Sequence, residues 1–303
     1  MSNASLALAG PDRPAQEAGS DPRIVPRRIL SLAGDQTIAY AETGTGPDLV
    51  AIHGTLMCLE DVWLGPVPAL AEHFRVVAVD RPGHGFSRRP RGRAADIWDQ
   101  AAQIREAVRR LGLERPVILG HSFGAAVALA YGMLHPDEIA GIVALAPICF
   151  PELRLEQVLF GPRALPFGGD VLSALLGGSS DRVLLPVLWN AMFLPEPMPP
   201  HFARQFPFAL AGRAAQITAD GEDAGWLWPA LTRSVLGYPS LRRPVHILGG
   251  SADLVVNTAL HGHRAASMIP GARFERLASV GHMLHHVRPD AVVRAALAVQ
   301  ASP

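Results

Sequence analysis

Short runs of β-branched and apolar residues alternate with stretches of helical periodicity along most of this chain. The pattern predicts two antiparallel edge strands at residues 28–32 and 37–41, followed by buried strands at 49–53, 75–80, 116–120, 141–147, 244–250 and 272–277. Apolar residues at helical spacing predict helices at residues 96–111, 123–135, 258–269 and 289–299. Strands that alternate with helices form parallel sheets covered on both faces. The sequence therefore predicts an α/β protein with a mostly parallel central sheet of about eight strands.

The alternation breaks once, between residues 149 and 238. This segment is rich in Pro, Phe, Leu and Trp, and its helical periodicity is weak. We expect it to form a helical cap (lid) inserted into a core domain made of residues 27–148 and 239–303, with its prolines breaking it into short helices. Residues 1–26 are expected to form a flexible N-terminal tail, because their start is rich in Ala, Gly, Pro and Asp. They also lack the basic leader and the apolar stretch expected of a secretory signal.

Composition narrows the function classes. Lys and Arg total 27, as do Asp and Glu, and the pI is near 7.2. The chain therefore has no net charge that would favour binding to nucleic acid or to anionic membranes. No uncharged apolar run reaches the roughly 18 residues that span a bilayer. Two cysteines, Cys58 and Cys149, lie beside apolar runs and are expected to be buried reduced thiols, which suits a cytoplasmic location. The expected partner is a small neutral molecule, and the oligomeric state stays open.

The segment Gly120-His121-Ser122-Phe123-Gly124 matches the pattern G-x-S-x-G. In this pattern a serine sits on a tight strand-to-helix turn, and the flanking glycines relieve crowding. The match alone has little weight in a chain with 29 glycines. Here a β-branched strand precedes the serine and an Ala-rich helix follows it, so we interpret Ser122 as a nucleophile rather than a structural turn serine.

A serine hydroxyl needs an adjacent base, and the base needs a carboxylate to orient it. Asp253 and His282 follow Ser122 in the expected order, and each lies in a loop after a predicted strand. His285 and His286 are alternative bases, but Gly281 and the position directly after the strand favour His282. For Asp253 the alternative role is a helix N-cap or loop carboxylate.

A tetrahedral intermediate needs two backbone N–H donors, one of them from the residue after the nucleophile. That residue is Phe123. The loop His53-Gly54-Thr55-Leu56 is expected to supply the second donor from Thr55, with Leu56 as the alternative. His53 itself is interpreted as a hydrogen bonder that structures this loop.

Together these motifs resemble the α/β-hydrolase superfamily, in particular its lid-bearing serine hydrolases, which include esterases and cofactor-free haloperoxidase-like enzymes. The resemblance spans about residues 28 to 300, and it includes the turn Asp80-Arg-Pro-Gly-His-Gly-Phe-Ser87. It implies an α/β-hydrolase fold. Haloalkane dehalogenases and epoxide hydrolases of this superfamily carry an aspartate at the elbow where Ser122 stands. The oxyanion loop also lacks the Gly-Gly-x-Pro-Gly stretch of many carbon–carbon hydrolases.

The residues and the resemblance predict acyl transfer to Ser122 followed by hydrolysis, with no metal or organic cofactor required. The apolar character of the cap, including Phe160, Phe167, Leu188 and Trp189, favours a small apolar carboxylic ester as substrate, although packing explains any one of these residues better. A perhydrolase, lactonase, amidase, carbon–carbon hydrolase or acyltransferase with the same triad stays open. So does a non-catalytic binding protein on the same fold.

Overall fold

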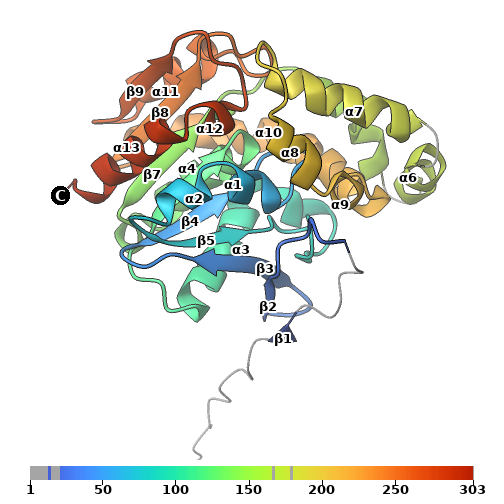
Figure 1. The fold of residues 1–303 in the computed structure, drawn as a ribbon, viewed down its shortest axis with the longest axis horizontal. Coiled ribbons are helices and arrows are strands. Elements are labelled where there is room, and N and C mark those ends of the chain that lie inside the picture. The colour runs from blue at the N-terminus through green and yellow to red at the C-terminus, as the bar shows by residue number, and fades with distance from the viewer. Residues whose placement is uncertain (1–12, 15–20, 166–167, 178–179, 303) are drawn as a thin grey trace, which may run out of the picture.

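One sheet organises the fold in the computed structural model, which describes residues 13–14, 21–165, 168–177 and 180–302. Its strands follow the order β1-β2-β3-β5-β4-β6-β7-β8-β9 (Figure 1). The strands are β1 Arg13–Pro14, β2 Arg28–Ser31, β3 Thr37–Thr43, β4 Asp48–Ile52, β5 Arg75–Val79, β6 Val117–His121, β7 Gly141–Leu145, β8 Val245–Gly250 and β9 Arg273–Leu277. From β5 to β9 all pairings are parallel, while β1, β2 and β3 add antiparallel strands at one edge. Apart from the two-residue β1, the eight strands match the prediction.

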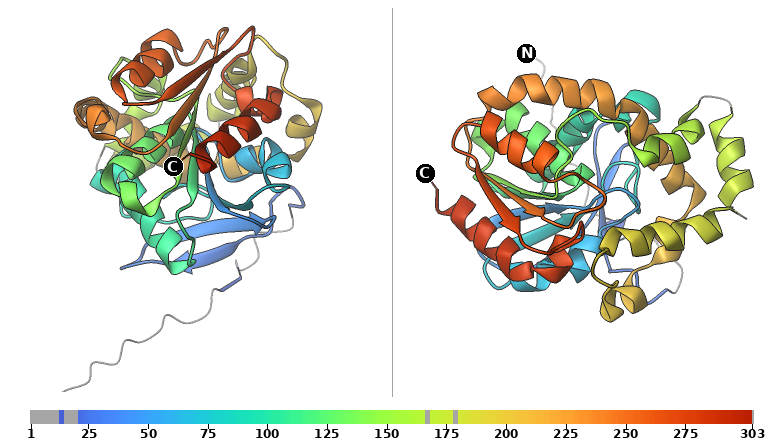
Figure 2. Two further views of the ribbon diagram at one scale, coloured as in Figure 1. Left: turned by 90° about the vertical axis from the view of Figure 1, so that its left-hand side faces the viewer. Right: turned by 90° about the horizontal axis from the view of Figure 1, so that it is seen from above.

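The central strands β4, β5, β6 and β7 are mostly apolar and buried because helices cover both faces of the sheet (Figures 1 and 2). One face carries α3 Ile97–Arg110, α4 Phe123–Leu134 and α11 Arg264–Met268, and the other carries α1 Glu60–Leu64, α2 Val67–Leu70, α12 Leu284–Val287 and α13 Pro289–Gln300. The predicted helix at 258–269 begins as a π-helical turn, Ala259–His263. The pattern missed α1, α2 and α12, which are too short to show a helical period.

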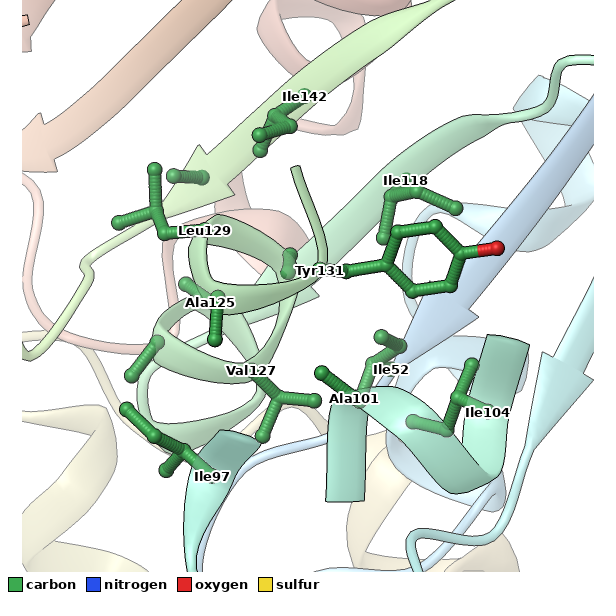
Figure 3. Close-up of a cluster of buried hydrophobic side chains, with 14 of the residues drawn as sticks. Ile52, Ile97, Ala101, Ile104, Ile118, Ala125, Val127, Leu129, Tyr131 and Ile142 are labelled. Carbon is green, nitrogen blue, oxygen red and sulfur yellow. The ribbon is translucent and has the colours of Figure 1, made fainter. Parts of the chain in front are cut away.

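The core on the α3–α4 face explains why α4 is Ala-rich. Ile52, Ile118 and Ile142 project from β4, β6 and β7 toward α4, which crosses them closely (Figure 3). Small side chains such as Ala125 let the helix approach the strands, and Ile104 of α3 packs from outside. This packing fixes the position of α4 on the sheet, and the turn that carries Ser122 lies directly before its first residue.

The segment 149–238 contains helices and, in the part that the structure describes, no strand. Its helices are α5 Leu155–Leu159, α6 Gly169–Gly177, α7 Ser180–Phe193, α8 Pro200–Gln205, α9 Phe208–Ala211 and α10 Ala214–Gly237. Phe167 and most of the N-terminal tail (1–12 and 15–20) lie outside the described residues. None of the described helices has the length and apolarity needed to cross a bilayer.

The expectation that prolines break this segment into short helices is wrong for its two longest helices. Pro186 lies inside the 14-residue α7, and Pro229 lies inside the 24-residue α10. A proline removes one backbone hydrogen bond. In α10 the turns beside Pro229 bury Leu227, Ala230 and Leu231 against the core, so tertiary packing keeps the helix continuous.

Candidate active site

Ser122 occupies a strained turn between β6 and α4. Its φ is 54° and its ψ is −114°, a conformation that L-residues rarely adopt. The two motif glycines make this turn possible, because a Cβ on Gly120 would lie 2.2 Å from the Gly124 carbonyl oxygen. A Cβ on Gly124 would lie 2.4 Å from the carbonyl oxygen of His53. The elbow geometry expected from G-x-S-x-G is present.

Asp253 and His282 lie in the loops after β8 and β9, and their side chains meet. His282 Nδ1 donates to Asp253 Oδ2 at 2.8 Å, and both side chains are buried. The N–H groups of Val255 and Val256 donate to Asp253 Oδ1, each at 2.8 Å. Although burial opposes ionisation, His282 and these N–H groups lower the pKa of Asp253. The ionised carboxylate fixes the tautomer of His282 and leaves a lone pair on Nε2.

His282 lies against the elbow. The ring centroids of His121 and His282 are 4.8 Å apart, and His121 Nε2 donates to the His282 carbonyl oxygen at 3.2 Å. His121 directly precedes Ser122. Among the described residues, His282 Nε2 has no hydrogen-bond partner, so its bond with the Ser122 hydroxyl is not formed in this state. Unliganded sites often show such bonds lengthened.

The loop after β4 presents backbone N–H groups next to Ser122. A Cβ built on Gly54 would lie 3.3 Å from the Ser122 Cβ, which places this loop directly beside the nucleophile. Phe123 is the first residue of α4, so its N–H has no acceptor within the helix. His53 Nε2 accepts from the Arg81 N–H at 2.9 Å, in agreement with its expected structural role.

Residues of the segment 149–238 hydrogen-bond with both backbone polar groups of Leu56. Its N–H donates to Asp220 Oδ1 at 3.2 Å, and its carbonyl oxygen accepts from Trp189 Nε1 at 3.0 Å. The Leu56 N–H is therefore occupied, whereas the Thr55 N–H makes no hydrogen bond within the described part of the chain. Sequence reasoning missed Asp220, because 164 residues separate it from Leu56 and no local motif marks it.

Asp220 belongs to a buried ionic network between α10 and the loop after β5. Arg81 Nη1 pairs with Asp223 Oδ2 at 2.6 Å, and Arg89 Nη1 pairs with Glu222 Oε2 at 2.7 Å. His84 Nε2 lies 3.0 Å from Asp220 Oδ1. Burial raises the pKa of Asp220 to about 7, against the opposing effect of Arg81. Glu222 and Asp223 thus bind arginines of the core.

A cavity of about 350 Å³ lies between the segment 149–238 and the loops after β4 and β8. Thr55 and Leu56 line it from the loop after β4. Its walls are mostly apolar side chains, namely Leu153, Leu155, Leu159, Phe160, Leu188, Met192, Leu194, Leu254 and Val255. One side carries Arg154, whose charge is balanced by Glu152 and Glu156. Five other aromatic residues of the segment pack together in one apolar cluster, in which Phe202 and Phe206 stack: Trp189, Phe193, Phe202, Phe206 and Phe208.

Comparison with known proteins identifies the family of this chain. The family model described as "alpha/beta hydrolase fold" matches residues 47–289, and the chain belongs to this family. An uncharacterised protein of Mycobacterium tuberculosis is 28% identical over 269 residues, which cover 83% of this chain and 74% of that protein. Haloalkane dehalogenase 2 of the same species is 34% identical over 106 residues, covering 35% of this chain and 37% of that protein. The crystal structure of the enol-lactonase from Burkholderia xenovorans superposes with a TM-score of 0.69 at 22% identity, covering 90% of this chain and all of that one (100%).

Proposed function

We propose that this α/β hydrolase is a serine hydrolase that cleaves small apolar carboxylic esters through an acyl-enzyme on Ser122. The observation that carries the proposal is the elbow beside the Asp253–His282 pair, with His282 Nδ1 bonded to the carboxylate at 2.8 Å and Nε2 left available as a base. A small closure brings the Ser122 hydroxyl to that nitrogen when substrate binds.

The reaction proceeds in two half-reactions. His282 Nε2 takes the Ser122 proton while the serine oxygen attacks the ester carbonyl, and the tetrahedral intermediate expels the alcohol, which receives that proton. Water then attacks the acyl-enzyme, giving its proton to His282, and the collapsing intermediate releases the carboxylic acid and returns the proton to Ser122. Asp253 stays ionised and stabilises the imidazolium in both halves.

The oxyanion donors in this proposal are the N–H groups of Thr55 and Phe123. Thr55 and Phe123 line the same small cavity, and Asp220 engages the competing N–H of Leu56 at 3.2 Å. Preorganised donors of this kind stabilise the charge that develops on the carbonyl oxygen.

The residue at the elbow separates this proposal from the chemistry named for some relatives. Haloalkane dehalogenase 2 is similar over about a third of this chain (35%). Alkyl displacement from a halide uses a carboxylate nucleophile in that group, whereas Ser122 offers a hydroxyl suited to acyl transfer. The cavity walls favour an apolar acyl or alcohol part. We propose further that residues 149–238 act as the cap that shapes this pocket, within the division 1–26, 27–148, 149–238 and 239–303.

Labelling with a fluorophosphonate probe tests the proposal. The wild type should be labelled on Ser122 and should hydrolyse p-nitrophenyl esters. Ser122→Ala should lose both properties, with kcat falling about 10⁴-fold or more. Ser267→Ala is the matched control, because Ser267 is exposed on α11 and bonds only to its own helix. A folded wild type that takes up no probe, or a label on another residue, refutes the serine mechanism. A protein that binds esters without turnover is a binding protein instead.

A further inference from the structure

Asp61 is a fully buried carboxylate outside the proposed triad. Asp61 lies on α1, and its Oδ1 accepts hydrogen bonds from His285 Nε2 at 3.0 Å and from His286 Nε2 at 2.9 Å. The side chains of all three residues are 0% exposed. A buried carboxylate costs several kcal/mol unless a cation compensates it. The chain contains no lysine, and among the described residues no arginine pairs with Asp61. Its partners are imidazoles alone.

The orientation of His121 adds an independent observation. Its Nε2 faces the His282 carbonyl oxygen at 3.2 Å and therefore carries the proton. Its Nδ1 then carries a lone pair, and this atom lies 3.7 Å from Asp61 Oδ2. Both atoms are buried, and within the described residues neither has a hydrogen-bond partner. Two electron-rich atoms that face each other without a donor repel, and a cation between them would satisfy both.

The distances agree with metal coordination. Zinc binds nitrogen and oxygen ligands at about 2.0 Å in tetrahedral sites, which separates neighbouring ligand atoms by about 3.3 Å. Here the separations from the Asp61 oxygens are 2.9, 3.0 and 3.7 Å, and the ligand atoms of Asp61, His285 and His286 all lie within 4.8 Å of one another. His121 lies outside this group of three, so its ring must move toward the other ligand atoms for a tetrahedron to close. A metal-binding histidine also commonly donates its other ring N–H to a backbone carbonyl, as His121 does.

We propose that these four side chains bind one divalent transition-metal ion of the zinc class. The group is called the Asp61 cluster below and consists of Asp61, His121, His285 and His286. Imidazole and carboxylate are ligands that suit zinc. The ion would tie α1, the end of β6 and α12 together behind the elbow. The role is structural, and it does not depend on the proposed ester hydrolysis.

A second group of potential ligands lacks these features. His84, Asp220 and Asp223 also converge, but the Arg81 guanidinium already pairs with Asp223 at 2.6 Å. The Arg81 guanidinium thus already compensates the negative charge of this second group. Our expectation that no metal is required came from sequence spacing, which cannot register the Asp61 cluster because 224 residues separate Asp61 from His285.

Metal content of the whole protein is the first test. The chain is purified without a histidine tag, dialysed against metal-free buffer and analysed by elemental mass spectrometry. We expect close to one zinc-class ion per chain, and a lower Tm after treatment with a strong chelator that added Zn²⁺ restores. Replacement by Co²⁺ should give the visible absorption of a four-coordinate site. A wild type that holds no ion, and whose Tm responds to neither chelator nor Zn²⁺, overturns the proposal.

Variants assign the ion to the cluster. His286→Gln retains an amide N–H that can donate to Asp61 but removes the metal-binding nitrogen, and it should lose the ion and the Zn²⁺-dependent rise in Tm. Asp61→Asn should do the same. His73→Gln, at an exposed histidine in the turn after α2, is the control and should keep the full ion content. If His286→Gln and Asp61→Asn bind as much metal as the wild type, the ion lies elsewhere and the assignment is wrong. If either variant fails to fold, the Co²⁺ spectrum of the wild type decides.

Discussion

Gly124 has no space for a side chain, because a Cβ there would lie 2.4 Å from the His53 carbonyl oxygen and 2.6 Å from that of Ile52. Backbone atoms of a buried strand cannot move aside cheaply. We therefore expect Gly124→Ala to lower the free energy of unfolding by about 1–3 kcal/mol and to reduce esterase activity. Chemical denaturation and p-nitrophenyl ester turnover measure the two effects.

Gly225 provides the opposite case for comparison. It lies exposed on α10, and a Cβ there would meet nothing within 4 Å. Because alanine is the better helix former, Gly225→Ala should raise stability by about 0.5–1 kcal/mol and leave activity unchanged. If the two substitutions have equal effects, backbone crowding at the elbow is not what requires glycine at position 124.

Asp220 should make stability depend on pH. Its pKa is raised to about 7 by burial, whereas in the unfolded chain it is close to 3.9. The folded protein therefore holds a proton that the unfolded chain releases, so this contribution is present at low pH and is lost as the pH rises from about 4 to about 7. The loss is at most about 1.4 kcal/mol per pH unit.

Asp220→Asn removes this titration. Between pH 5 and 8, the wild type should lose stability relative to the variant as pH rises, and the difference should level off above pH 7. Parallel urea titrations at each pH measure it. A stability difference between wild type and variant that stays constant from pH 5 to pH 8 would show that Asp220 is ionised throughout, held by Arg81.

Sequence separation explains which residues could be predicted. The five residues around Ser122 form a local motif, and the positions of Asp253 and His282 follow from strands that end at one edge of the sheet. Asp220, by contrast, is one acidic residue among many on a helix whose register on the core cannot be read from the chain. The same holds for Asp61, whose partners lie on α12.

At the scale of elements, α7 contributes one wall of the cavity. Leu188 lines the cavity, while Val183, on the same helix, is 73% exposed and lies away from it. Leu188→Ala should therefore lower kcat/KM for long acyl esters more than for acetate esters, since each buried methylene contributes about 0.8 kcal/mol. A chain-length series of p-nitrophenyl esters measures the difference, with Val183→Ala as control. Equal losses for acetate and octanoate would mean that the acyl chain binds elsewhere.

The sequence also misjudged the helices of the segment 149–238. The break in strand–helix alternation predicts a helical segment there, but it could not reveal that α7 and α10 continue through Pro186 and Pro229. Local chemistry favours a break at each proline, and only the contacts of the neighbouring turns with other elements outweigh it. Leu153, Leu155 and Leu254, which line the cavity, were not singled out because they lie in irregular or short segments.

At the scale of the whole molecule, α10 joins the segment 149–238 to the core. Its second half buries Leu231 in the same apolar cluster as Ile97 and Leu129, and Trp98 Nε1 of α3 donates to the Ala230 carbonyl oxygen at 3.1 Å. Its first half carries the acidic residues that pair with Arg81 and Arg89. Within the segment, the Thr218 hydroxyl of α10 hydrogen-bonds with that of Ser173 on α6 at 2.6 Å. Helix α10 therefore makes buried contacts with both parts of the protein.

We therefore expect the protein to unfold in one cooperative transition, with equal calorimetric and van't Hoff enthalpies. Leu231→Ala should move this whole transition to lower temperature, because truncating a buried leucine costs about 2–5 kcal/mol. Leu236→Ala, on the same helix but 79% exposed, should leave it in place. Differential scanning calorimetry distinguishes the outcomes. A separate low-temperature peak that Leu231→Ala does not shift would mean that the segment 149–238 unfolds independently, and that α10 does not couple it to the sheet.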